Sequence, residues 1–299
     1  MTSVELIKRG ARFYKGGMKG LSNFDFDRSG RRMGGYGRAM VMGILNVTPD
    51  SFSDGGRFFD PRIAVEHGKR MVEEGADFLD IGAESTRPGS VPVSAEDELA
   101  RVLPVLEPLA GLVDCPISVD TYKASVADAC IKAGARVVND VWGFQKDPDM
   151  ARVCAVHGVG VVLMHNRTSI DPSLDMVAEV IAFLQRSIEI GTQAGIAKER
   201  IALDPGIGFG KTLEQNLALV NAVDALGRLG CAVLIGVSRK SMIGKIVPST
   251  TDERLPGTIA LDSVAQMKGA EIFRVHDVQE AVQAARVIDQ LKGMPWIPS

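Results

Sequence analysis

The stretch VMGILNVTPDSFSDGG, residues 41–56, joins an apolar, β-branched segment to a polar loop that ends in two glycines. Loops that follow strands in α/β proteins are usually about 2 to 6 residues long, and this one is longer and chemically richer. The same unit recurs along the chain. Eight short apolar runs end in polar residues, and they lie at 41–47, 78–84, 116–120, 136–141, 160–165, 200–206, 232–238 and 272–277.

The segments between these runs have the spacing of amphipathic helices, and several of them close on glycine; examples are 123–134, 212–230 and 278–293. Alternating strands and helices predict a parallel sheet, and the continuous apolar character of the strands indicates burial on both faces. Eight units within about 260 residues favour an α/β fold of the (β/α)8 TIM barrel type. A doubly wound sheet is disfavoured because no glycine fingerprint follows the first run.

The chain has 299 residues, of which 45% are hydrophobic and 24% are charged, and no apolar run approaches the length of about 20 residues that a membrane helix needs. We expect a single barrel domain at 38–293, an irregular N-terminal extension at 1–37 and a short tail at 294–299. The first residues lack the apolar core of a signal peptide, so we expect a cytoplasmic protein with no membrane partner.

The formal net charge is −3, and the Lys and Arg residues are scattered along the chain. This distribution argues against a nucleic-acid partner, so any anion site must be local. The four cysteines contain no CxxC pair and lie in apolar contexts, which argues against a zinc site and against a disulfide framework. We expect four buried free thiols.

Polar side chains gather at the predicted strand ends, where a barrel of this type builds its active site. A single polar residue there can simply mark the turn into a loop, but eight polar ends together predict a site. The residues are Asn46, Asp80 with Glu84, Asp120, Asn139 with Asp140, His165, Asp204, Ser238 with Arg239 and Lys240, and Arg274 with His276.

The side chains at these ends fall into two chemical groups. The first suits a flat heterocycle with amino and ring N–H groups, and consists of the acceptors Asp120, Asn139 and Asp204 with Lys240 as a donor. The second suits a phosphate group and a hard metal ion, and consists of Arg274, His276 and Asn46. Together the two groups predict a site for a heterocyclic phosphate ester.

The segment GIGFGKT, residues 206–212, looks like a phosphate-binding P-loop. The required glycine falls on Pro205, and the segment also fails the GxGxxG pattern, so we do not expect nucleotide binding there. As a barrel loop, the segment is expected to present Phe209 and Lys211 at the rim.

Seven motifs, in this order, closely resemble the dihydropteroate synthases, a family of pterin-binding enzymes. They are LNVTPDSFSDGG, DIGAESTRPGS, SVDTYK, NDVWG, DPGIGFGKT, SRKS and RVHD. The resemblance runs from about residue 40 to residue 278 and includes seven of the eight predicted strands. It implies a transferase of folate biosynthesis that joins 6-hydroxymethyl-7,8-dihydropterin diphosphate to 4-aminobenzoate and releases pyrophosphate.

The resemblance also implies residue roles, Mg2+ as cofactor, a homodimer and a target of sulfonamides. The catalytic group would be Asp120, Asp204, Lys240, Arg274 and His276. The pterin diphosphate would contact these five residues together with Thr86, Asn139 and Val275. The contacts to 4-aminobenzoate would come from Phe52, Arg87, Pro88, Phe209 and Ser241, and those to Mg2+ from Asn46 and Asp54.

Two alternatives remain at this stage. A pterin-binding methyltransferase domain would share the barrel but would not need a diphosphate site, and Arg274, His276 and the TPDSFSDGG loop count against it. A catalytically silent paralogue that only binds pterin is disfavoured by the intact motifs. Release of pyrophosphate in the presence of both substrates would distinguish the silent paralogue from the enzyme.

Overall fold

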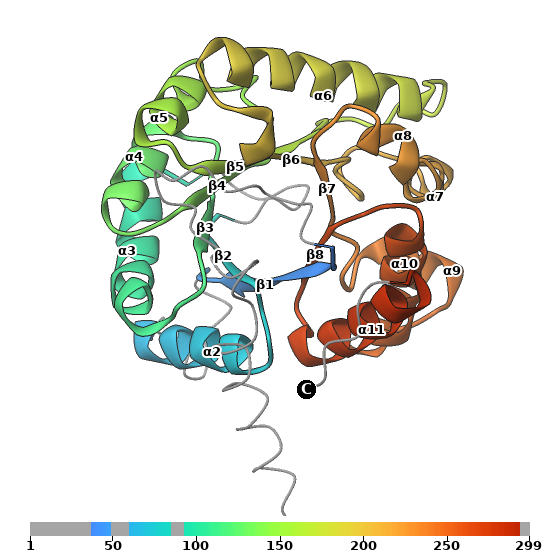
Figure 1. The fold of residues 1–299 in the computed structure, drawn as a ribbon, viewed down its shortest axis with the longest axis horizontal. Helices are drawn as coiled ribbons and strands as arrows, with labels where there is room; N and C mark the ends of the chain where they lie inside the picture. The colour runs from blue at the N-terminus through green and yellow to red at the C-terminus, as the bar shows by residue number, and fades with distance from the viewer. Residues whose placement is uncertain (1–36, 49–59, 85–92, 294–299) are drawn as a thin grey trace, which may run out of the picture.

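Eight parallel strands form a closed barrel in the order β1 to β8, as the computed structural model shows for residues 37–48, 60–84 and 93–293 (Figure 1). The strands are β1 Met40–Asn46, β2 Phe78–Gly82, β3 Ile117–Asp120, β4 Val137–Asp140, β5 Gly160–Met164, β6 Ile201–Asp204, β7 Ala232–Ile235 and β8 Ile272–Val275. Strand β1 pairs with both β2 and β8, which closes the sheet. The predicted (β/α)8 barrel is confirmed.

The helices form an outer ring around the barrel (Figure 1). They are α2 Pro61–Glu73, α3 Ala95–Leu112, α4 Ala124–Lys132, α5 Met150–His157, α6 Met176–Gln193, α7 Leu213–Asn221, α8 Val223–Gly227, α9 Ser241–Ile246, α10 Leu255–Met267 and α11 Val278–Leu291, with short 3-10 turns at Lys198–Arg200 and Asp252–Arg254. The segment 212–230, expected as one helix, is divided at Ala222. Its N–H donates to the Leu219 carbonyl at 3.1 Å, an i to i−3 bond that tightens the turn and separates α7 from α8.

Two apolar layers hold the barrel together. One lies between the strands and the surrounding helices, and the other fills the barrel interior with inward-facing side chains. The interior layer consists of Met40, Met42, Phe78, Val137, Val162, Ala202, Ala232, Leu234 and Ile272. Because side chains alternate along a strand, the next inward positions toward the carboxyl ends are Asp80, Asn139, Asp204 and Arg274. A plug of apolar side chains therefore lies beneath a polar layer.

The register of the strands places the polar residues side by side. Asp80 lies opposite Ser118 in β3, and Asp120 lies between Gly82 and Asn139 on its two neighbouring strands. The carboxyl ends of β2, β3 and β4 therefore meet as one polar surface inside the barrel.

All four cysteines are free, and three of them are buried as predicted, whereas Cys115 is only partly buried. Within the described ranges, no helix combines the length and the apolar character that a membrane crossing requires. The expected extension at 1–37 and tail at 294–299 lie almost wholly outside the described residues, so the domain boundaries stay predictions.

One carboxylate stands out among the buried side chains of the helices. Asp262 of α10 is buried, and neither of its carboxylate oxygens has a hydrogen-bond partner in the described part of the chain. Burial raises the pKa of Asp262 well above its ordinary value because no partner replaces the lost water. The folded chain thus keeps a proton there that the unfolded chain releases above about pH 4, so the free energy of unfolding falls as pH rises from that point.

We expect Asp262→Asn, which removes this titration, to be more stable relative to the wild type at about pH 8 than at about pH 5. The difference in the free energy of unfolding between the variant and the wild type should grow by about 1.4 kcal/mol per pH unit, until the pH reaches the pKa of Asp262 in the folded state. Differential scanning calorimetry at both pH values measures it, with Glu107→Gln on the exposed face of α3 as the control. A difference that is the same at both pH values would contradict this reading of Asp262.

Candidate functional site

Arg274 lies at the centre of the polar layer and joins three strands. Its Nε donates to Asp80 Oδ2 at 2.6 Å, and one terminal nitrogen donates to Asp120 Oδ2 at 2.9 Å. Asp80 is completely buried and Asp120 nearly so. Burial raises the pKa of Asp120 to about 7, because the loss of water and the neighbouring Asp80 outweigh the opposing effect of Arg274.

Asp80 also sets the orientation of the Asn139 amide. The Asn139 Nδ2 donates to Asp80 Oδ2 at 3.0 Å, the same oxygen that accepts from Arg274. This bond turns the amide nitrogen toward Asp80 and leaves Asn139 Oδ1 as a buried acceptor, without a partner among the described residues. The hydrogen-bond network thus presents an oxygen rather than an amino group to a ligand.

Asp204 and Lys240 form the opposite side of the polar layer. Asp204 Oδ1 accepts from the Gly206 N–H at 2.7 Å, which leaves Oδ2 for other partners. A Cβ atom at Gly236 would lie 3.9 Å from this Oδ2 and 3.8 Å from the Arg274 Cβ, so the glycine keeps the space between the two side chains open. Burial raises the pKa of Asp204, and the Lys240 ammonium opposes that rise.

The ammonium group of Lys240 lies close to the aromatic ring of Phe209. Its Nζ donates to the Ile207 carbonyl and lies 4.8 Å from the centroid of the Phe209 ring. Burial lowers the pKa of Lys240 to about 8, although Asp204 favours the charged form. The ammonium is therefore held between a carboxylate, a carbonyl and an aromatic face.

The loop that carries Phe209 is fastened from inside. Lys211 is only 4% exposed, and its Nζ donates to the carbonyls of Gly206 at 2.7 Å and Phe209 at 3.0 Å. The expectation that Lys211 lies at the rim is therefore wrong. Gly206 has a φ of 68°, and a Cβ there would come within 1.9 Å of the His165 carbonyl, so only glycine fits. The loop folds over its own lysine because its glycines allow the close approach.

His276 and Ser238 meet at the ends of β8 and β7. The Ser238 hydroxyl lies 3.0 Å from His276 Nδ1, and it accepts the His276 backbone N–H at 3.1 Å. Val275, between Arg274 and His276, is 1% exposed and belongs to the outer apolar layer, so only its backbone can reach a ligand. Ser241, the first residue of α9, is exposed.

Asn46 ends β1 and lies next to Gly82 of β2. A Cβ at Gly82 would lie 3.8 Å from Asn46 Oδ1 and 3.6 Å from Asp120 Oδ2, so both oxygens lie beside the position that a side chain at residue 82 would occupy. Among the described residues there is no group of three His, Cys, Asp or Glu side chains that could hold a metal. Asn46 thus offers a single neutral oxygen ligand.

Five residues singled out in the sequence lie outside the described ranges, namely Phe52, Asp54, Thr86, Arg87 and Pro88. The described residues nevertheless bring together the four side chains expected to hold a heterocycle, which are Asp120, Asn139, Asp204 and Lys240. Arg274 lies between them as a fifth residue. Of the residues expected to contact 4-aminobenzoate, Phe209 and Ser241 are described.

Of the remaining polar strand ends, Glu84 and Asp140 have hydrogen-bond partners, whereas neither ring nitrogen of His165 has one among the described residues. Glu84 accepts from Lys123 at 2.5 Å and from the Tyr122 hydroxyl at 3.0 Å. Asp140 accepts from the backbone N–H groups of the turn that follows it, and burial raises its pKa to about 6. His165 is fully buried edge-on against Phe183, and burial lowers its pKa to about 3, so it is a neutral core residue.

Comparison with known proteins gives a consistent result. A family model described as "Pterin binding enzyme" matches residues 42–276. The dihydropteroate synthase of Clostridium beijerinckii is 48% identical over 253 residues, which are 84% of this chain and 94% of that protein. The Bacillus subtilis enzyme is 46% identical over 254 residues, or 85% and 89% of the two chains.

Solved structures agree with the sequence matches. A dihydropteroate synthase from Clostridium difficile, determined in the presence of pteroic acid, has a TM-score of 0.83 at 46% identity and covers 90% of this chain and 99% of its own. The Xanthomonas albilineans enzyme in complex with 7,8-dihydropteroate has a TM-score of 0.79 at 43% identity, covering 86% and 95%. The Yersinia pestis enzyme with a sulfonamide drug has a TM-score of 0.80 at 42% identity, with the same coverage.

We expect Asp80→Ala to lower the free energy of unfolding by about 3 to 5 kcal/mol, because it leaves the buried Arg274 guanidinium without one of its carboxylates. Asp80→Asn keeps an oxygen for both donors and should lose less. Chemical denaturation measures the effect, with Asp224→Ala in an exposed pair with Arg228 as the control. If Asp80→Ala costs no more than the control, the polar layer does not depend on this residue.

Proposed function

This chain belongs to the pterin binding enzyme family, and from that premise we propose which of its residues carry the reaction. The chain is a transferase of folate biosynthesis. It condenses 6-hydroxymethyl-7,8-dihydropterin diphosphate with 4-aminobenzoate to give 7,8-dihydropteroate and pyrophosphate.

The pterin ring is held by the convergent acceptors and donor of the polar layer. Asn139 Oδ1 and Asp204 Oδ2 are oriented acceptors, and they suit the amino and ring N–H groups of a pterin. Lys240 stands next to Asp204 and suits the ring carbonyl. The observation that carries this assignment is that the backbone and Asp80 already fix which atom of each group faces the ligand.

The diphosphate is held at the β8 end by Arg274, His276 and the Val275 backbone, with Thr86 from the following loop of β2. Two N–H groups of Arg274 donate to Asp80 and Asp120, and the described residues leave the other three of its five N–H groups for phosphate oxygens. The carboxylates therefore hold the guanidinium in place and still leave N–H donors that can bind phosphate.

Asn46 and Asp54 are the residues that would hold Mg2+. Asn46 would contribute a neutral oxygen and Asp54 a carboxylate, and Mg2+ commonly combines one or two carboxylates with substrate phosphates and water. When bound, Mg2+ supplies positive charge to the departing diphosphate.

The reaction needs no protein nucleophile. Cleavage of the C–O bond can run ahead of attack, because the dihydropterin ring delocalises the cation that forms. Asp120 and Asp204 place negative charge beside that ring, while Arg274 and His276 stabilise the charge that grows on the leaving pyrophosphate. The amine of 4-aminobenzoate then attacks, placed by Phe209 and Ser241 together with Phe52, Arg87 and Pro88.

Two further proposals concern the setting of the enzyme. Four free cysteines support a reducing, cytoplasmic location. A homodimer is supported by large apolar side chains that are exposed on the neighbouring helices α10 and α11, at the lower right of Figure 1; this part of the molecule is here called the α10–α11 face. Its large exposed side chains are Val264, Met267, Val287 and Leu291, with exposed fractions of 45%, 56%, 61% and 71%.

We expect Asp204→Asn to weaken binding of the pterin diphosphate by about 2 to 4 kcal/mol. If the new amide oxygen keeps the bond to the Gly206 N–H, its NH2 group faces the donors of the pterin, so an attraction becomes a repulsion. Isothermal titration calorimetry measures the affinity, with Asp224→Asn on α8 as the exposed control. Unchanged affinity would remove Asp204 from the pterin site.

A second prediction concerns the α10–α11 face. Replacing Val287 and Leu291 together by Glu should convert a dimer to a monomer, because two charges would enter an apolar contact. Sedimentation equilibrium measures the mass. The matched control is Leu112→Glu on α3, an equally exposed leucine on the opposite side of the barrel. A wild-type monomer, or a dimer that survives both substitutions, would refute the assignment of this face.

A further inference from the structure

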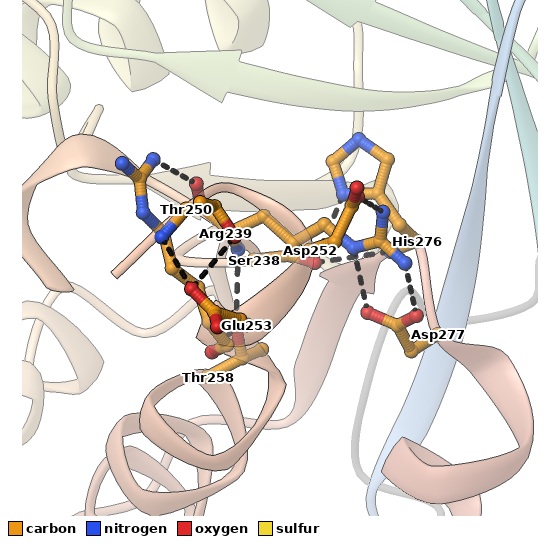
Figure 2. A network of polar contacts seen from close by, with 9 residues as sticks. Ser238, Arg239, Thr250, Asp252, Glu253, Thr258, His276 and Asp277 are labelled. Carbon is orange, nitrogen blue, oxygen red and sulfur yellow. Dashed lines mark hydrogen bonds and ion pairs between the residues drawn. The ribbon is translucent and has the colours of Figure 1, made fainter. Parts of the chain in front are cut away.

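Ser238 lies directly beneath the ring of His276, as Figure 2 shows. The serine is 5% exposed, so its hydroxyl has little access to water. The oxygen accepts the backbone N–H of His276 at 3.1 Å and lies 3.0 Å from the ring atom Nδ1. Both contacts of this hydroxyl are thus made with the same histidine.

The directions of these two bonds determine where the ring carries its proton. A backbone N–H can only donate, so the serine oxygen is the acceptor in the first bond. The hydroxyl proton then needs an acceptor, and within the described ranges His276 Nδ1 is the one at hydrogen-bond distance. An accepting Nδ1 carries no proton, so the neutral imidazole has its hydrogen on Nε2.

A surrounding network of hydrogen bonds holds Ser238 and His276 at a fixed separation. Arg239, next to Ser238, has an uncommon positive φ of 56° and donates through its side chain to both oxygens of Asp277, next to His276, at 3.0 and 2.5 Å. Its backbone N–H donates to Thr258 Oγ1 at 3.0 Å (Figure 2), and its carbonyl accepts from Arg254 at 3.0 Å. A strained residue that is held by four hydrogen bonds to three residues fixes the distance between the ends of β7 and β8.

We propose that Ser238 is a positioning residue that fixes His276 in the Nε2–H tautomer, so that the ring donates a hydrogen bond to the diphosphate of the substrate. This inference rests on the diphosphate role proposed above for His276. The opposite tautomer would turn a nitrogen lone pair toward the phosphate oxygens, where two acceptors repel each other. Ser238 therefore ensures that the ring presents an N–H donor, and not a lone pair, to the anion.

The tautomer can be observed directly in the full-length protein. The chain has only four histidines, so selective 15N labelling gives four ring systems, and loss of one set in His276→Gln assigns the signal. Long-range 1H–15N correlation spectra at about pH 8, where a free histidine is neutral, distinguish the nitrogens. We expect a protonated Nε2 and an unprotonated Nδ1 for His276. A proton on Nδ1 in the wild type overturns the proposal, whatever the variants do.

The variants then separate the hydroxyl from simple packing. Ser238→Ala should give a mixture of tautomers and weaken the binding of pyrophosphate by about tenfold, whereas Ser238→Thr, which keeps the hydroxyl, should restore both readouts. Ser249→Ala, at a partly exposed serine in the loop before α10, is the control. A pure Nε2–H signal in Ser238→Ala overturns the role of Ser238. If His276→Gln binds pyrophosphate as the wild type does, the diphosphate role of His276 fails, while the tautomer result stands on its own.

Discussion

The ion pairs that Arg274 makes with Asp80 and Asp120 are the interaction on which the site depends. Charges inside a barrel are costly unless they are paired, and this guanidinium pairs with carboxylates from two other strands. Through the shared oxygen of Asp80, the same contact orients the Asn139 amide. One cation thus fixes the side chains of β2, β3, β4 and β8, and it opposes the rise that burial causes in the pKa of Asp120.

The proposed site has two parts, one on the strand ends and one assigned to the segments that follow β1 and β2. The part of the site that we propose for the pterin is built mainly on strand ends, and its side chains are held by a backbone N–H group and by one another, so we expect little reorganisation when the ring binds. The contacts assigned to 4-aminobenzoate and Mg2+ come largely from the segments after β1 and β2. A site for the heterocycle that is built on strand ends suits the proposed reaction, in which the pterin cation forms in a fixed environment.

The sequence predicted the barrel because its signals are local: eight apolar runs with polar ends and helical spacing between them. It predicted the polar strand ends for the same reason. Contacts between distant residues were not accessible. The 3.1 Å bond at Ala222 divides a helix that the periodicity made continuous. Lys211 looked like a rim residue because lysines are usually exposed, yet the glycine turns fold two carbonyls around its amine. The pairing of Ser238 with His276, 38 residues apart, depends on strand adjacency and register.

The most direct test of the account is the release of pyrophosphate by the purified chain. With 6-hydroxymethyl-7,8-dihydropterin diphosphate, 4-aminobenzoate and Mg2+ present, the account predicts one pyrophosphate for each 7,8-dihydropteroate formed. It also predicts little release without the amine, because the site must protect the pterin cation from water. Absence of pyrophosphate with both substrates, or equal release without 4-aminobenzoate, would contradict the claim that these strand ends carry out the condensation.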